Sequence, residues 1–203
     1  MTATGRRFSI NFDYRCPFAR NAHEHVLAAL SGGADYRVQF VAFSLSQVHV
    51  AEGEKPVWED PTARDQLLAI AAGIVVRERY ADLFPAAHRA LFAARHDEGG
   101  DLRDEKVVRS ALAHAGIDDV AVFTELASGW PFELFRQEHE TAVQGHAVFG
   151  VPTFIVDDQA VFVRLMTRPR GDNELARATI DRVLELLVDH PDLNEFKHTS
   201  IPR

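Results

Sequence analysis

Apolar residues occupy every second position of residues 8–12, and they do so again in residues 36–42. This period of two predicts two β-strands. Between them, apolar residues at helical spacing follow Pro17, and Ser31-Gly32-Gly33 ends the run, which predicts a helix. The order strand, helix, strand predicts that the two strands pair in parallel.

The middle of the chain, from about residue 60 to residue 148, carries helical patterns only. Helix starts are expected at Asp60-Pro61, Pro85, Asp101 and Pro131, and the third of these helices is expected to end at Gly116. Because no strand pattern interrupts this stretch, we expect an inserted helical subdomain.

Strand patterns return at residues 153–156 and 160–163, separated by Asp157-Asp158-Gln159. A turn of this length between two strands predicts an antiparallel hairpin. The last pattern is helical and is expected to start at Asp172 or Asn173 and to end at His190-Pro191.

Composition and charge narrow the class of protein. The 203 residues are 46% hydrophobic and 26% charged, which is typical of one globular domain with room for an insertion. No apolar run reaches the length of a membrane span, and MTATGRRFSI passes directly into strand-like sequence, so we expect neither a membrane span nor a secretory signal. The net charge of -8 disfavours binding to nucleic acid or anionic lipid.

Cys16 is the single cysteine, so an intramolecular disulfide is excluded and a reducing cytoplasm is the expected compartment. It stands at the start of the predicted first helix, where backbone N–H groups favour negative charge. We therefore expect its pKa to fall below the usual value of about 8.5, with Arg15 and Arg20 adding positive potential. The alternative is that Cys16 is a small buried apolar residue, the usual fate of a free cysteine.

Two segments carry a resemblance to a known family. FDYRCPFA resembles the C-P-x-C segment of DsbA-type thioredoxin-fold oxidoreductases, and residues 149–155 resemble that family's Val-cis-Pro loop. The resemblance implies a cis Val151-Pro152 bond and an α/β, thioredoxin-like fold with an inserted all-helical subdomain. Residues 1–58 and 149–203 would form the thioredoxin-like domain, and residues 59–148 the helical insertion.

Within the family, the sequence resembles cytoplasmic members, because Arg168-Pro169-Arg170-Gly171 precedes the last predicted helix. These members include the mycothiol-dependent nitroreductases and FrnE-like proteins and, more distantly, the kappa-class glutathione transferases and hydroxychromene-carboxylate isomerases. The resemblance implies mycothiol or glutathione as co-substrate, no tightly bound cofactor, and a homodimer as the usual assembly.

Ala19 stands where the family has its second cysteine. A two-cysteine enzyme releases its mixed disulfide with that second thiol, so only a monothiol cycle remains, in which an external thiol releases the partner of Cys16. The partner would be a small thiol or a protein disulfide. The residues expected to bind it are Pro17, Phe18, Ala19, Val151, Pro152 and Thr153.

Two other functions remain open. In a kappa-transferase-like or isomerase-like enzyme, a non-covalently bound thiol cofactor would be activated for attack on an electrophile, although those relatives typically place Ser at the position of Cys16. In a redox-inactive binding module, the fold would be kept for peptide binding, dimerisation or redox sensing.

Further candidate residues have both a functional and a structural interpretation. Arg164, Arg168 and Arg170 form either a solvated loop or a receptor for a carboxylate. The aromatic residues Trp58, Trp130, Phe132 and Phe135 form either core or an apolar groove above the thiol.

The histidines do not predict a metal site. His23 and His25 point to different faces of their helix, and His139 and His146 have no acidic or cysteine partners at ligand spacing.

Overall fold

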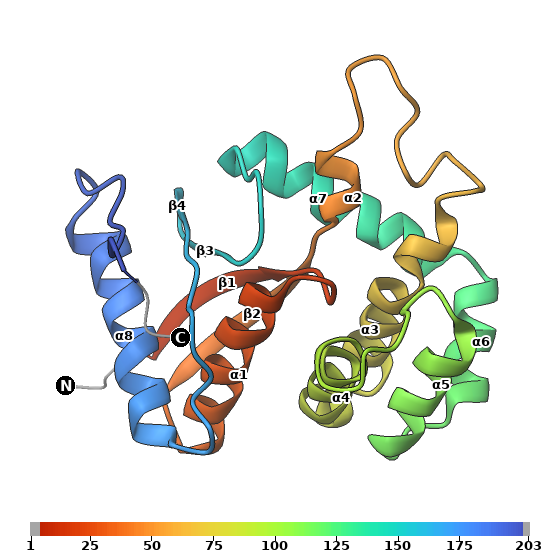
Figure 1. Cartoon of the computed structure of the whole chain (residues 1–203), viewed down its shortest axis with the longest axis horizontal. Coiled ribbons are helices and arrows are strands. Elements are labelled where there is room, and N and C mark those ends of the chain that lie inside the picture. The colour runs from red at the N-terminus through yellow and green to blue at the C-terminus, as the bar shows by residue number, and fades with distance from the viewer. Residues whose placement is uncertain (1–4, 201–203) are drawn as a thin grey trace.

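The computed structural model describes residues 5–200, which form one sheet surrounded by helices (Figure 1). The strands are β1 (Arg6–Phe12), β2 (Tyr36–Ala42), β3 (Thr153–Val156) and β4 (Gln159–Phe162), in the spatial order β2-β1-β3-β4. β1 pairs with β2 in parallel, whereas β3 is antiparallel to both β1 and β4. The predicted parallel pair and the predicted hairpin are thereby confirmed.

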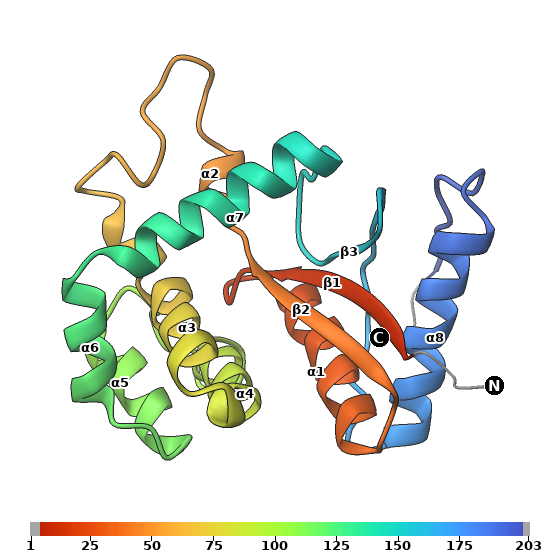
Figure 2. The same cartoon turned by 180° about the vertical axis from the view of Figure 1, so that it is seen from behind.

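Helices α1 (Pro17–Ser31) and α8 (Asn173–Asp189) lie side by side against the sheet (Figures 1 and 2). Their apolar residues pack on Phe8, Ile10 and Phe154 of the strands. Proline is well tolerated in the first turn of α1, because the N–H that it lacks would have no partner within the helix.

The other helices lie between β2 and β3 in the sequence. They are α2 (Leu45–Val48), α3 (Leu68–Arg79), α4 (Phe84–His96), α5 (Glu105–His114), α6 (Asp119–Ala127) and α7 (Trp130–His146), with 3₁₀ turns at Arg64–Leu67 and Ala81–Leu83. Helices α3 to α6 form a group beside the sheet, and α7 runs from that group back past β2 (Figure 2). Their apolar core continues to Phe12, Tyr14 and Cys16, so it reaches the start of α1. No helix within residues 5–200 has the length and apolarity to cross a membrane.

Two predicted helix starts are wrong for the same physical reason. The carboxylate of Asp60 accepts the N–H of Thr62 at 2.9 Å, and that of Asp101 accepts the N–H of Arg103 at 3.0 Å. Each aspartate thus forms a local turn with the residue two positions on, and the backbone after that turn does not continue directly into an α-helix. The helices begin only afterwards, and α2 and α6 were not predicted at all.

Arg77 connects the helical group to the sheet. From α3, its guanidinium donates to the Phe40 carbonyl of β2 and forms an ion pair with Glu138 of α7. Glu138 also accepts the N–H of Ala42 at 2.6 Å. Because the side chains of Arg77 and Glu138 are only 14% and 15% exposed, this ion pair joins β2 to two helices in a largely buried position.

Candidate active site

Cys16 lies at the junction between the loop after β1 and helix α1. Its N–H donates to the Asp13 carbonyl at 3.0 Å, and its carbonyl accepts the N–H of Arg20 at 3.1 Å, the first hydrogen bond of the helix. The predicted N-cap position is thus confirmed. The residue is 6% exposed, so its sulfur lies at the edge of the core.

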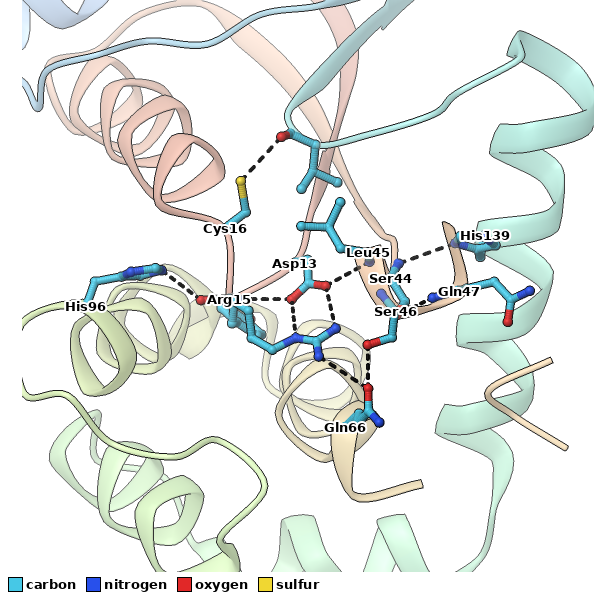
Figure 3. A network of polar contacts seen from close by, with 12 residues as sticks. Asp13, Arg15, Cys16, Ser44, Leu45, Ser46, Gln47, Gln66, His96 and His139 are labelled. Atoms are coloured by element: carbon cyan, nitrogen blue, oxygen red, sulfur yellow. Dashed lines mark hydrogen bonds and ion pairs between the residues drawn. The ribbon is translucent and has the colours of Figure 1, made fainter. Parts of the chain in front are cut away.

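A second loop, which leads into β3, faces this sulfur. Its Val151–Pro152 peptide bond is cis, the isomer that the resemblance implies. The Cys16 thiol donates to the Val151 carbonyl, with a distance of 3.4 Å between Sγ and oxygen (Figure 3). The Pro152 carbonyl accepts the N–H of Val163 at 3.0 Å, which ties the loop to the end of the hairpin. The two predicted halves of the site therefore meet.

Asn11 of β1 holds this loop in place through its side chain. The sequence analysis gave Asn11 no role. Its side-chain nitrogen donates to the Gly150 carbonyl at 3.0 Å, and its side-chain oxygen accepts the N–H of Thr153 at 2.6 Å. The two contacts bracket Val151 and Pro152. Because Asn11 is fully buried, both hydrogen bonds are shielded from water. The Thr153 hydroxyl donates to Gly150 as well, so both donors of Thr153 are engaged within the protein.

A buried row of aromatic side chains continues from Asn11 into the helical group. His23 of α1 contacts the Asn11 carbonyl at 3.0 Å, His88 of α4 contacts His23 at 2.9 Å, and the Tyr14 hydroxyl contacts His88 at 2.8 Å. A carbonyl can only accept, so His23 donates to it, His88 donates to His23, and Tyr14 donates to His88. A side chain at Gly73 of α3 would collide with the Tyr14 hydroxyl.

Burial keeps both histidines of this row neutral. It lowers the pKa of His23 to about 4 and that of His88 well below the usual value, with the neighbouring His23 contributing to the second shift. Burial also raises the pKa of Tyr14. The three side chains therefore form one uncharged chain of hydrogen bonds between α4, α1 and β1.

The expected direction of the Cys16 pKa is wrong. Burial raises the pKa of this thiol above its usual value, and the Asp13 carboxylate raises it further. The backbone N–H groups of Ala19 and Phe18, and the Arg164 guanidinium, lower the pKa but do not outweigh burial. Neither N–H group has the geometry of a capping hydrogen bond to the sulfur. The resting residue is thus a thiol, not a thiolate.

The two arginines that flank Cys16 in sequence do not point their charges at it. Arg15 pairs with Asp13, whose carboxylate also accepts the N–H of Leu45 at 2.9 Å. Figure 3 shows Arg15 reaching toward Gln66 while the thiol points toward the opposite loop. Arg20 forms ion pairs with Glu24 and Asp97.

Comparison with known proteins identifies the family of the chain. Residues 9–167 match the family described as the DSBA-like thioredoxin domain. The chain belongs to this family. The matched residues include Cys16 and the cis-proline loop. A comparison with curated proteins found no match.

Solved structures of the same fold come from several enzymes. A 2-hydroxychromene-2-carboxylate isomerase is 18% identical, with a TM-score of 0.60 over 93% of this chain and 100% of its own. A probable DsbA oxidoreductase from Streptomyces coelicolor is 15% identical, with a TM-score of 0.59 over 96% and 93%. The cytosolic disulfide reductase DsbM from Pseudomonas aeruginosa, solved with GSH, is 15% identical, with a TM-score of 0.59 over 89% and 100%. These likenesses show that the chain shares the DsbA-like α/β fold.

The three arginines that follow the hairpin have different surroundings. Arg168 forms ion pairs with the carboxylates of Glu24 and Asp97, so it links its loop to α1 and to the end of α4. Arg170 is exposed in the turn before α8 and has a φ of 50°. Arg164 lies over two aromatic rings at the active site.

The four aromatic residues pack as core. Phe135 is fully buried, and Trp58, Trp130 and Phe132 pack against the same cluster. Trp58 and Phe132 also line a pocket of about 460 Å³, but Cys16 is not among the residues that line it. The interpretation as core is thus the better one.

The histidines near the site serve the fold. His139 accepts the N–H of Ser44 at 3.3 Å, and burial lowers its pKa to about 4. His25 donates to the Thr167 carbonyl at 3.1 Å. Across residues 5–200, no group of three or more His, Cys, Asp or Glu side chains is placed to hold a metal ion.

Proposed function

We propose that the protein is a monothiol oxidoreductase in which Cys16 forms a mixed disulfide with a small thiol or a protein. One observation carries the proposal: the only sulfur nucleophile lies at the start of α1, with its Sγ 3.4 Å from the carbonyl of the cis-proline loop. Membership of the DSBA-like family supports thiol-disulfide chemistry at this position. The absence of a second cysteine limits that chemistry to a monothiol cycle.

The cycle has two exchange steps. The Cys16 thiol first loses its proton to water, and the thiolate attacks one sulfur of a disulfide RSSR. The S–S bond of RSSR breaks, a bond forms between Cys16 and one half, and the other half leaves as a thiolate. A second thiol then attacks the half bound to Cys16, forms a new small disulfide with it and returns the Cys16 thiolate. The net reaction exchanges one thiol for another in a disulfide.

We propose that the partner pairs with the Val151 backbone; Val151 and Cys16 are 2% and 6% exposed, so the partner has to open the contact between them. Within residues 5–200, nothing accepts a hydrogen bond from the Val151 N–H, and the Val151 carbonyl is held only by the Cys16 thiol. An extended partner that pairs with this backbone donates its own N–H to the carbonyl and displaces the thiol. The released thiol loses the hydrogen bond that favours its protonated form, which promotes ionisation.

We further propose mycothiol or glutathione as the co-substrate, in a reducing cytoplasm. The single cysteine supports this proposal, because the protein contains no structural disulfide for an oxidising compartment to maintain. A neighbour of the same fold, DsbM, is described as a cytosolic disulfide reductase with GSH, which supports this setting.

Intact-mass spectrometry tests the proposal. The purified protein is incubated at pH 8.5 with oxidised glutathione or oxidised mycothiol, and the adduct is then treated with a reductant. We expect a mass increase of one thiol that the reductant removes, and turnover when both thiol and disulfide are present. The Cys16→Ser variant should fold normally but show neither adduct nor turnover.

Two outcomes contradict the proposal. Turnover retained by Cys16→Ser would show that the sulfur is not the nucleophile. A folded wild-type protein that forms no adduct with either disulfide, even at pH 9.5, would favour a redox-inactive binding module.

A second function is favoured by the protonation of Cys16. Because burial raises its pKa, the thiol remains an S–H donor near neutral pH, and such a donor stabilises the thiolate of a bound cofactor. A transferase-like or isomerase-like enzyme needs this arrangement and no mixed disulfide. Formation of a thioether product, or isomerisation that requires glutathione without any Cys16 adduct, would support this second function.

A further inference from the structure

Three aromatic side chains surround the two halves of the thiol site. Phe18 lies two residues after Cys16, Phe149 precedes the cis-proline loop, and Phe162 ends β4. Phe149 is 66% exposed, and its ring centroid lies 5.3 Å from that of Phe162. A Cβ at Gly150 would lie 3.2 Å from the Phe162 ring, so the loop passes close to this ring. We call Phe18, Phe149 and Phe162 the aromatic rim.

Arg164 lies over this rim. Its guanidinium carbon is 5.4 Å from the ring centroid of Phe18 and 5.9 Å from that of Phe162, within the range of cation–π contacts. The guanidinium therefore lies between Phe18 of α1, the helix that follows the thiol, and Phe162 at the end of β4. It is also close enough to lower the pKa of Cys16.

Within residues 5–200, no carboxylate neutralises this guanidinium by direct contact. Among the described residues, Arg164 forms neither an ion pair nor a hydrogen bond through its side chain. The carboxylate of Glu195 is near enough for Arg164 to help lower its pKa, but it is paired with Lys197. Arg168, four residues further on, has two carboxylate partners. Within the part of the chain that the structure describes, the positive charge of Arg164 beside the thiol thus has no direct carboxylate partner.

We propose that Arg164 and the aromatic rim bind the carboxylate end of the small thiol or disulfide that exchanges with Cys16. This inference rests on the proposed function and narrows its substrate class: small disulfides that carry a carboxylate, as glutathione disulfide does, are preferred over neutral ones, which include mycothiol disulfide, and over cationic ones. A guanidinium held on aromatic rings pairs with a carboxylate without first ordering a flexible side chain. The rim covers the apolar part of the same ligand.

The chemistry of the exchange is unchanged by this contact. The thiolate of Cys16 attacks the sulfur of the half whose carboxylate lies at Arg164, the S–S bond breaks, and the other half leaves as a thiolate with its own carboxylate. The proton of Cys16 goes to water. No oxidant is needed beyond the disulfide itself.

Three small disulfides of different charge test the inference. Dithiodiglycolate is anionic, 2-hydroxyethyl disulfide is neutral and cystamine is cationic. The second-order rate of Cys16 capping by each disulfide is measured by intact mass at pH 8.5. The rates of the same three disulfides with N-acetylcysteine amide, a free reference thiol, are measured for comparison. We expect the ratio of anionic to neutral rates to exceed that of the reference thiol, and the ratio of cationic to neutral rates to fall below it.

Variants separate binding from the effect on the pKa of Cys16. Arg164→Gln slows every reagent through the thiol pKa, and uncharged iodoacetamide measures that common factor. The ratio of the anionic to the neutral capping rate does not depend on that factor. It should fall about fivefold, as expected for the loss of a partly exposed ion pair. Arg164→Lys should keep most of the ratio, and Arg168→Gln, the matched control, should keep all of it. Added salt should weaken the preference of the wild type.

The outcomes distinguish this inference from the proposed function. Equal anionic-to-neutral ratios in the wild type and Arg164→Gln overturn the inference, even if capping itself proceeds. Rapid capping by a neutral peptide disulfide, with all small disulfides slow, also overturns it in favour of a protein substrate. If none of the reagents caps Cys16 in the folded protein, the proposed function itself fails.

Discussion

Asn11 fixes the geometry of the thiol site through one buried amide. It contacts Gly150 on one side of Val151-Pro152 and Thr153 on the other. Its position in β1 therefore determines where the Val151 carbonyl lies relative to the sulfur. Asn11 does not touch the reacting atoms, so its role is that of a positioning residue.

Replacement of Asn11 by leucine should affect capping more than simple alkylation. The variant loses two buried hydrogen bonds, and we expect the free energy of unfolding to fall by about 2–3 kcal/mol in urea titrations. Capping by oxidised glutathione should slow several-fold relative to alkylation by iodoacetamide, because only capping uses the Val151 backbone.

Gln47→Leu is the matched control for this variant. It removes a hydrogen bond from the Val57 N–H to the Gln47 side-chain oxygen at 2.8 Å, away from the loop and from Arg164. Equal ratios of capping to alkylation in the two variants would show that Asn11 stabilises the fold without positioning the loop.

The thiol of Cys16 should titrate above the same thiol in the unfolded chain. Because burial raises the folded pKa, the midpoint of the rate of iodoacetamide alkylation against pH should lie higher in buffer than in concentrated urea. By linkage, the folded state gains stability below the unfolded pKa of about 8.5 and loses it as pH rises through the folded pKa. Cys16→Ser should lack that alkaline loss, and a midpoint below that of the unfolded chain would contradict the prediction.

For single residues, the sequence predicted where the site lies but not the protonation state of Cys16. The start of α1 and the cis-proline loop could be predicted because their signals are local: Cys-Pro before a helical pattern, and Val-Pro before a strand. The burial of Cys16 depends on side chains from distant parts of the chain. The hydrogen bonds of Asn11 to Gly150 and Thr153 also join distant parts of the chain. A polar residue inside an apolar strand was the one available signal for Asn11.

Among the elements, β2, α3 and α7 depend on the pair formed by Arg77 and Glu138. Glu138→Ala should remove the partner of a largely buried guanidinium, and we expect it to destabilise the protein by about 3–5 kcal/mol in urea titrations. The double variant Arg77→Met with Glu138→Leu should recover most of that loss, since it leaves no unpaired charge. A double variant less stable than Glu138→Ala would show that the hydrogen bonds to Phe40 and Ala42 matter more than the charge.

Helix positions were predictable where a proline marks the first turn, as in α1, α4 and α7. They were not predictable where an aspartate forms a local turn instead. Asp60, Asp101 and Asp104 each accept the N–H two residues on, yet only Asp104 caps a helix, α5, as Asp172 caps α8. The residue type is the same in all four cases, and only the following backbone distinguishes a turn from a cap.

The whole molecule carries an acid sensitivity in its buried histidines. Burial lowers the pKa of His23 and of His139 to about 4, and that of His88 is also lowered. A depressed pKa contributes stability above the unfolded value of about 6.5, and this is lost as pH falls toward the folded value. We therefore expect the free energy of unfolding to fall between about pH 6.5 and 4, by about 3 kcal/mol for His23 alone.

Urea titrations at a series of pH values check this loss. His139→Gln is the informative variant, because the amide oxygen can still accept the N–H of Ser44 while the titrating group is gone. Its stability should depend less steeply on pH than that of the wild type. A wild-type free energy of unfolding that is flat between pH 7 and pH 4.5 would contradict the prediction.

The sheet that supports the site is made from the two ends of the chain. Asn11 of β1 binds Thr153, which is 142 residues further along. At roughly 5–20 residues per second, a ribosome needs roughly 7–30 s to cover that distance. Throughout this interval, the newly made β1 has an open edge where β3 will later pair, and open strand edges invite association with other chains. Synthesis of this protein thus includes a period in which its first strand is exposed to chaperones and to aggregation.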